Sequence, residues 1–139
     1  MNPTTACSTD DIGKLILRVT VALLLLFHGI SKLMAGSNPI IGAVTAAGLP
    51  AAFGHLVYVG ELIAPLLILL GIGTRPAALV VSVNMVVAIL LVHTAELLTL
   101  SKTGGWALEL QGFFLFGALA VALLGAGKFS LGGAAGKWN

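Results

Sequence analysis

Long apolar stretches separated by short polar breaks dominate the sequence. Four stretches are apolar enough, and at about 20 residues each long enough, to cross a membrane as helices; they are residues 12–34, 52–72, 76–98 and 106–125. The breaks between them contain residues typical of turns, such as Gly36, Gly73 and Gly104. The pattern predicts an all-α, polytopic membrane protein in which four transmembrane helices form one bundle, a single membrane domain over residues 1–139.

Residues 38–50 form a further, mildly apolar stretch that is too short to span a membrane. We expect this stretch to be interfacial or re-entrant and to cover one end of the bundle. In the fourth stretch Ala118, Ala122 and Ala126 recur at every fourth position. This spacing of small residues lets membrane helices approach each other closely, so we expect tight packing between the helices.

The composition supports a chain that is surrounded by lipid. Of the 139 residues 58% are hydrophobic and 9% are charged, and the mean hydropathy is +1.09. Soluble domains contain about 25% charged residues, and a short soluble chain could not bury so much apolar surface. The net charge of +2 comes from scattered basic residues, which argues against nucleic acid as a partner. The single cysteine, Cys7, cannot form an intramolecular disulfide.

The basic residues predict how the helices are oriented. With four spans, both termini and the loop between the second and third spans lie on one side of the membrane. That side would hold five of the seven basic residues, Lys14, Arg18, Arg75, Lys128 and Lys137, and the other side would hold Lys32 and Lys102. Because Lys and Arg are enriched in cytoplasmic loops, we expect a multi-pass protein of the inner (cytoplasmic) membrane with both termini in the cytoplasm.

Ionisable side chains within the predicted spans are the candidates for function, because a charge inside the membrane is costly and usually faces the bundle interior. Glu61 is the deepest of them, near the middle of the second span. At about 1.5 Å per residue, one side chain from each helix lies roughly 4–8 Å below the outer surface. These side chains are His28, His55, His93 and Glu109. Their common level predicts one polar site in the outer half of the bundle.

Further polar residues flank this level. On the second helix Tyr58 lies one turn outward from Glu61, and Arg18 lies toward the cytoplasmic end of the first helix. Lys32 and Glu96 lie at the outer rim, where long side chains also reach water without any functional role. For Glu61 we expect either a protonated, hydrogen-bonded carboxyl group or a carboxylate paired with a basic residue of the first helix.

These side chains support more than one chemistry. A quinone headgroup needs hydrogen-bond donors, a proton source and an apolar slot for its tail. For such a site we assign catalytic roles to Glu61, His28 and His93, and cofactor binding to Arg18, Lys32, His55, Tyr58 and Glu109. Imidazole and carboxylate groups also bind metals, but no H-x-x-x-H or E-x-x-H pair shares a helix, so no metal site is assigned. The alternatives left open are a small proton-coupled transporter and a non-catalytic subunit that anchors a soluble partner.

The order of several motifs resembles the DoxX family of small bacterial membrane proteins. After Arg18 the first stretch contains FHGISKL at 27–33, the second contains GEL at 60–62, and GAGKFSL follows at 125–131. The resemblance covers residues 13–132 and departs from the family at Gly132, where Asp is usual. It implies a four-helix inner-membrane protein linked to membrane oxidoreductases, some of which use quinones. A soluble or membrane redox partner is implied as well, and the sequence leaves open whether the chain forms a homo-oligomer.

Overall fold

The computed structural model describes residues 8–36, 38–133, 136 and 138–139. Cys7 and Lys137 lie outside this part of the chain. Within it the regular elements are all helical, and extended pairing is limited to one isolated bridge between Leu100 and Trp106. The all-α prediction is therefore confirmed for the described residues.

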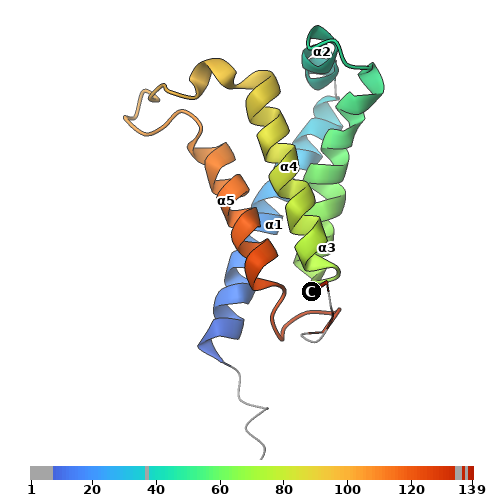
Figure 1. The fold of residues 1–139 in the computed structure, drawn as a ribbon, viewed down its shortest axis with the longest axis vertical. Helices are drawn as coiled ribbons and strands as arrows, with labels where there is room; N and C mark the ends of the chain where they lie inside the picture. Colours follow the sequence, from blue (N-terminus) through green and yellow to red (C-terminus); the bar gives the residue numbers. More distant parts are fainter. Residues whose placement is uncertain (1–7, 37, 134–135, 137) are drawn as a thin grey trace, which may run out of the picture.

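Four long helical segments form the body of the molecule (Figure 1). Three are continuous α-helices: α1 (Thr9–Ala35), α4 (Thr74–Val92) and α5 (Glu109–Leu124). The other long segment consists of the 3-10 helix η1 (Ala51–Leu56), the π-helix η2 (Val59–Ile63) and the α-helix α3 (Ala64–Leu70). Both α1 and α4 pack against α3 and α5, so the four segments form a ring.

Two short helices lie at the end of the bundle opposite the termini (Figure 1). The first is α2 (Asn38–Ala46), which packs against η1 and α4. It lies in the stretch expected to be interfacial or re-entrant. The second is η3 (Thr94–Glu96), a 3-10 turn that follows α4. Of these two helices, α2 contributes to the wall of the candidate site described below.

Three segments are long and apolar enough to cross a membrane, judged by length and composition: Thr9–Ala35, Ala51–Leu70 and Thr74–Val92. The helix α5 is apolar but has only 16 residues. At about 1.5 Å per residue its length is about 24 Å, which is shorter than the hydrocarbon core of about 30 Å. The structure therefore supports three spanning helices and a shorter apolar fourth.

Two predicted helix boundaries are wrong at the end near η3. A helix was expected from residue 106, but α5 begins at Glu109. The reason is that Trp106 and Ala107 belong to the preceding loop, where the indole N–H of Trp106 donates to Leu97 O and the Ala107 N–H donates to Thr99 O. The third helix was expected to reach residue 98, but α4 ends at Val92, and the chain then turns through η3.

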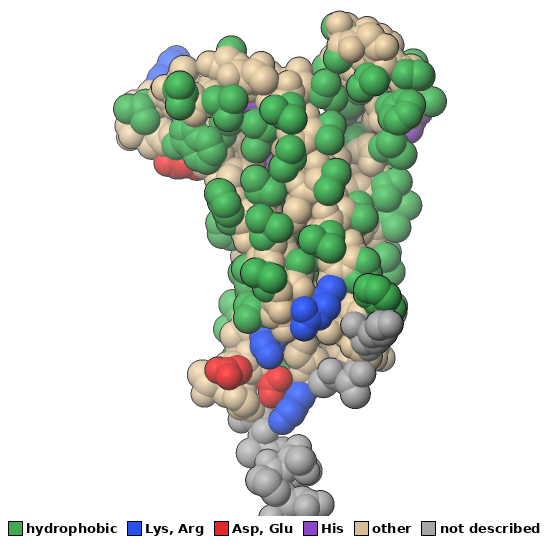
Figure 2. Space-filling model, in the orientation of Figure 1, with side chains coloured by type: hydrophobic (Ala, Val, Ile, Leu, Met, Phe, Trp, Pro, Cys, Tyr) green, Lys and Arg blue, Asp and Glu red, His purple; other side chains and the backbone are tan. Residues whose placement is uncertain are grey.

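The core of the bundle consists of small and medium-sized apolar side chains from the four long segments. It includes Ala22, Leu25, Ala64, Ile68, Ala78, Val81, Phe114, Ala118 and Ala122. Many larger apolar side chains are exposed instead, and Figure 2 shows them along the length of the helices on the visible face. An outer surface of this kind is what lipid contact requires. Burial of Ala118 and Ala122 agrees with the close packing expected from their spacing.

Two arginines close the end of the bundle that holds the termini. The guanidinium group of Arg18 is buried and donates to the carbonyl oxygens of Ile68, at 3.4 Å, and Phe129. Carbonyl groups in the last turn of a helix have no N–H donor within that helix. The guanidinium group of Arg75 supplies N–H donors to two such carbonyl groups at the end of α5. It donates to the carbonyl oxygens of Ala122, Leu123 and Asn139. These bonds attach the segment after α5 to the start of α4.

Candidate functional site

Glu61 lies in the π-helical turn η2, and Pro65 explains why the turn is wide. In a regular α-helix the Glu61 carbonyl oxygen would accept from the residue four positions later, but Pro65 has no N–H, and its ring would collide with that oxygen. The Ala64 N–H instead donates to Val59 O, five residues earlier. Single π turns of this kind are frequent at functional sites. Here the turn carries Glu61, a residue that is only 2% exposed as a whole.

Two glycines let the neighbouring helices approach this turn. A Cβ atom on Gly29 of α1 would collide with the backbone carbonyl oxygen of Glu61. A Cβ atom on Gly60 would collide in the same way with the side chain of Asn84 on α4. Any larger residue at either position would push a helix away, so the two glycines bring α1 and α4 into direct contact with η2.

The Glu61 carboxylate is paired with Lys32 of α1. Lys32 Nζ lies 2.5 Å from Glu61 Oε1, and Asn84 Nδ2 donates to the same oxygen at 3.5 Å. Of the two states expected for Glu61, this geometry matches the carboxylate that is paired with a basic residue of the first helix. Glu61 Oε2 is buried and has no hydrogen-bond partner among the described residues. Leaving a buried acceptor unpaired is costly, so this oxygen is available to a ligand or to water.

An open groove of about 530 Å³ reaches the Lys32–Glu61 pair from the flank of the bundle. Its walls come from α2, η1, η2 and α4, and they are mostly apolar. Along α4 the groove extends from Val80 to His93, which is about 20 Å at the rise of an α-helix. Four polar side chains line it, those of Lys32, Glu61, Asn84 and His93. The groove thus combines a long apolar wall with a small polar cluster.

A second cavity, of about 80 Å³, lies on the side of the pair toward α5. Its polar lining consists of His28, Lys32, Glu61, His93 and Gln111, and its apolar lining includes Phe114 of α5. Lys32, Glu61 and His93 therefore line both cavities. The Lys32–Glu61 pair and His93 thus lie between the groove on one side and the small cavity on the other.

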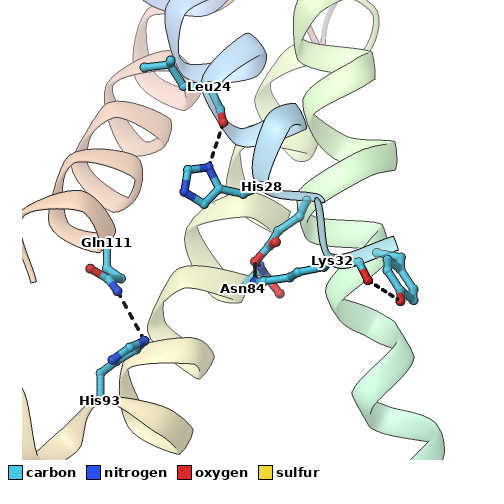
Figure 3. A network of polar contacts seen from close by, with 8 residues as sticks. Leu24, His28, Lys32, Asn84, His93 and Gln111 are labelled. Atoms are coloured by element: carbon cyan, nitrogen blue, oxygen red, sulfur yellow. Dashed lines mark hydrogen bonds and ion pairs between the residues drawn. The ribbon is translucent and has the colours of Figure 1, made fainter. Parts of the chain in front are cut away.

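Both histidines that line the small cavity make defined contacts (Figure 3). His28 Nδ1 lies 2.9 Å from Leu24 O, and because a carbonyl oxygen only accepts, this nitrogen carries a proton. His93 Nε2 lies 3.3 Å from the amide nitrogen of Gln111, and its Nδ1 lies 2.8 Å from Glu96 Oε2. Within the described ranges no group of three His, Cys, Asp or Glu side chains gathers in a way that could hold a metal ion.

The structure brings together only some of the residues expected at the site. Tyr58 lies beside the cluster, with its hydroxyl 3.5 Å from Lys32 O. His55 is exposed, stacks on the Tyr58 ring at a centroid distance of 6.3 Å, and lines neither cavity. Glu109 is also exposed, because it is the first residue of α5 and not one turn inside a span. Arg18 lies at the opposite end of the bundle. His28 and His93 line the small cavity, although His28 is itself exposed, whereas His55 and Glu109 are exposed and line neither cavity. The expected convergence of all four side chains on one interior site is therefore wrong.

Asn84 and Gln111 belong to the cluster, although the sequence assigned neither of them to the site. At about 100° per residue Asn84 falls on the face of α4 nearly opposite to His93, which argued against a shared site. The helical angle between Asn84 and His93 does not hold in the structure, because α4 ends at Val92 and His93 no longer has a helical backbone. The residue type could have indicated that Asn84 and Gln111 belong to the site, since amide side chains within apolar helices usually form hydrogen bonds between helices.

Comparison with known proteins identifies the family. The DoxX family model matches residues 13–94, a range that covers more than half of the chain and extends from α1 to the residues after α4. The chain belongs to the DoxX family. The matched range includes Lys32, Glu61, Asn84 and His93, so most of the polar cluster lies within the family domain. Family membership and the apolar helices make this a multi-pass membrane protein in contact with the lipid bilayer.

One similar protein is named "Putative oxidoreductase CatD" and comes from Bacillus subtilis (strain 168). It is 31% identical to this chain over 84 residues, which are 59% of this chain and 60% of the relative. The chain therefore matches less than two thirds of that relative's length. No solved structure matches the chain.

Proposed function

We propose that this DoxX-family protein is a component of a membrane oxidoreductase system and that it binds a quinone. The headgroup would lie at the Lys32–Glu61 pair and the apolar tail would lie along the groove beside α4. The observation that carries the proposal is the connection of a polar cluster to a long, open, apolar groove. The name of the Bacillus subtilis relative, an oxidoreductase, agrees with this class of function.

The size and chemistry of the groove support a headgroup of this kind. Small-molecule sites commonly have volumes of about 300–1,000 Å³ and combine apolar walls with a few polar groups, and the groove has about 530 Å³. Quinone oxygens accept hydrogen bonds. The Lys32 ammonium group has three N–H donors and the Asn84 amide has two, and each has N–H groups beyond the one directed at Glu61. These remaining donors would orient the headgroup.

Glu61 would handle protons in this site. Reduction of a quinone to a quinol consumes two electrons and two protons, one proton for each oxygen. Within the proposal the electrons come from a soluble or membrane redox partner. One proton reaches the nearer headgroup oxygen through the Lys32–Glu61 pair, which is then reprotonated, and the second proton reaches the other oxygen from water at the mouth of the groove. Glu61 Oε2, which is buried and unpartnered among the described residues, would accept a hydrogen bond from the quinol hydroxyl group that forms.

We further propose that α5 is the fourth membrane crossing, that both termini are cytoplasmic, and that the membrane is the inner one. Two observations support an even number of crossings. Lys128 after α5 pairs with Asp11 near the start of α1, at 3.6 Å, and the start of α1 lies at the same end of the bundle as the last described residue (Figure 1). The excess of basic residues at that end favours the cytoplasm. In this orientation the site opens in the outer half of the bundle.

A quinone with a short tail tests the proposal. The protein would be placed in lipid nanodiscs and titrated with decylubiquinone. Val87→Trp narrows the groove, because Val87 is an exposed groove residue, and Val86→Trp is the matched control, since Val86 is equally exposed but outside the groove. We expect Val87→Trp to weaken binding at least about tenfold, or about 1.4 kcal/mol, with little change for Val86→Trp. An absence of binding to the native chain, or equal binding to both variants, would favour the anchoring subunit.

A further inference from the structure

Glu61 needs a route by which protons reach it. Its side chain is 3% exposed, and among the described residues its polar contacts are with Lys32 and Asn84. An amide does not titrate, and an ammonium group holds its proton tightly at neutral pH. Imidazole is different, because it gains and loses a proton near neutrality. The two histidines beside Glu61 are therefore the groups to examine.

The small cavity connects Glu61 with both of these histidines. Its volume of about 80 Å³ compares with about 30 Å³ for one water molecule in the liquid, so it has room for two or more waters. The small cavity is open to the surface, as the groove is, so waters that remain in it must be held by its lining. Ordered waters of this kind have two to four polar partners, and the lining supplies them from Glu61, His28, His93 and Gln111. Water in this cavity would contact the Glu61 carboxylate and the imidazole of His93 together.

His93 also reaches the outer surface of the protein. Its side chain is 27% exposed, and its Nδ1 lies 2.8 Å from Oε2 of Glu96, which is 51% exposed. On the inner side the amide nitrogen of Gln111 can only donate, so His93 Nε2 accepts and Nδ1 carries the proton directed at Glu96. If Nε2 also gains a proton, a flip of the Gln111 amide presents its oxygen as an acceptor. The surroundings thus accommodate both protonation states of His93.

We infer that His93, held between Glu96 and Gln111, is the point at which protons enter from the outer surface and pass through the small cavity to Glu61. In the Nε2–H tautomer, with the Gln111 amide flipped so that its oxygen accepts, His93 Nδ1 takes up a proton from bulk water on the side of Glu96. Nε2 then releases its proton to cavity water, which protonates Glu61, and a return of the neutral imidazole to the Nε2–H tautomer resets the route. No electrons move in these steps. The other groups that face the route are His28 and Lys32 from α1. The inference rests on the proposed proton role of Glu61 and extends it by naming the route.

A pH-jump experiment tests the route without any quinone. The chain has three glutamates, Glu61, Glu96 and Glu109, so carbon-13 labelling of Glu and comparison with Glu61→Gln assign the infrared carboxyl band of Glu61. In nanodiscs we expect His93→Ala to slow protonation of Glu61 about a hundredfold, the lower range for loss of a positioned proton-transfer group. Imidazole added to the buffer should restore the rate. Lys102→Gln is the control, because Lys102 is exposed and lines neither cavity.

Two results would overturn the inference. One is an unchanged protonation rate in His93→Ala, and the other is a slowed rate that imidazole does not restore, which would indicate a structural effect of the substitution. If His93→Ala does not fold, Gln111→Leu retains the imidazole and removes the amide, and an unchanged rate in that variant overturns the role of Gln111. Failure of the native chain to bind decylubiquinone would contradict the proposed function and leave the measured proton route intact.

Discussion

At the scale of single residues, the Lys32–Glu61 pair is the feature on which the site depends. The sequence predicted that Glu61 is functional or structural, because a carboxylate deep in a membrane span is costly. The sequence also indicated a basic residue of the first helix as a candidate partner, but it left open whether Glu61 is protonated or paired. Counting helical rise separates Lys32 from Glu61 by two to three turns, but the count ignores helix tilt, the 3-10 and π turns before α3, and the length of a lysine side chain. These features bring the two charges to 2.5 Å.

Replacing Glu61 should separate its structural from its chemical contribution. Glu61→Gln keeps the shape and most of the hydrogen bonding, so we expect the fold to remain. Glu61→Leu leaves Lys32 and Asn84 without their acceptor, which should lower the free energy of unfolding by roughly 1–3 kcal/mol. Thermal unfolding in detergent measures both variants. Glu109→Leu is the control, because that carboxylate is exposed and its loss should change stability by less than about 0.5 kcal/mol. Equal stability of Glu61→Leu and the native chain would contradict the pairing.

At the scale of the elements, the apolar pattern predicted where the long helices lie but not how the second one is built. Length and hydropathy are insensitive to whether a turn is α, 3-10 or π. The sequence does contain the local cause of the π-helical turn, which is Pro65, four residues after Glu61. The packing of this turn also depends on α1, where Gly29 lets the helix approach the Glu61 backbone. Helix ends were predicted less well, since loop residues such as Trp106 are apolar as well.

The approach of α1 to η2 can be tested with two alanine substitutions in the same helix. A Cβ atom at position 29 collides with the Glu61 carbonyl, whereas one at position 13 meets no atom within 4 Å. We expect Gly29→Ala to destabilise the protein by about 1–3 kcal/mol through overpacking. Gly13→Ala should be neutral or stabilising by up to about 1 kcal/mol, because Ala is the better helix former. Unfolding in detergent distinguishes the two, and equal stability of both variants would show that the contact is not tight.

At the scale of the whole molecule, the sequence predicted an all-α membrane protein and its family, and it could not predict how the two ends of the bundle are closed. Arg18 was expected to bind a cofactor. Instead it donates to Ile68 O and to Phe129 O after α5. Arg18 and Phe129 are 111 positions apart in the sequence. Their contact depends on the path of the chain after α5, and that path cannot be predicted from the pattern of neighbouring residues. The result is a molecule with arginine-based closure at one end and the polar cluster at the other.

The two ends of the helix bundle differ in their side chains, and this difference supports separate roles for them. The end with Arg18 and Arg75 holds the termini and the segment after α5 in place. The opposite end combines the groove, the ion pair and the small cavity. The groove opens on a flank with exposed apolar side chains such as Val83 and Val87, so the proposed quinone would enter it from the bilayer.

Photoaffinity labelling with an azido-quinone tests the central claim most directly, because it reports where the headgroup and tail bind. The protein in nanodiscs would be labelled, digested and analysed by mass spectrometry, with excess decylubiquinone as competitor. We expect competed labels on the two walls of the groove, within Phe53–Glu61 and Val80–His93, and their loss in Val87→Trp but not in Val86→Trp. Labels at the end that holds Arg18, or labels that decylubiquinone does not displace, would contradict a quinone site beside Lys32 and Glu61.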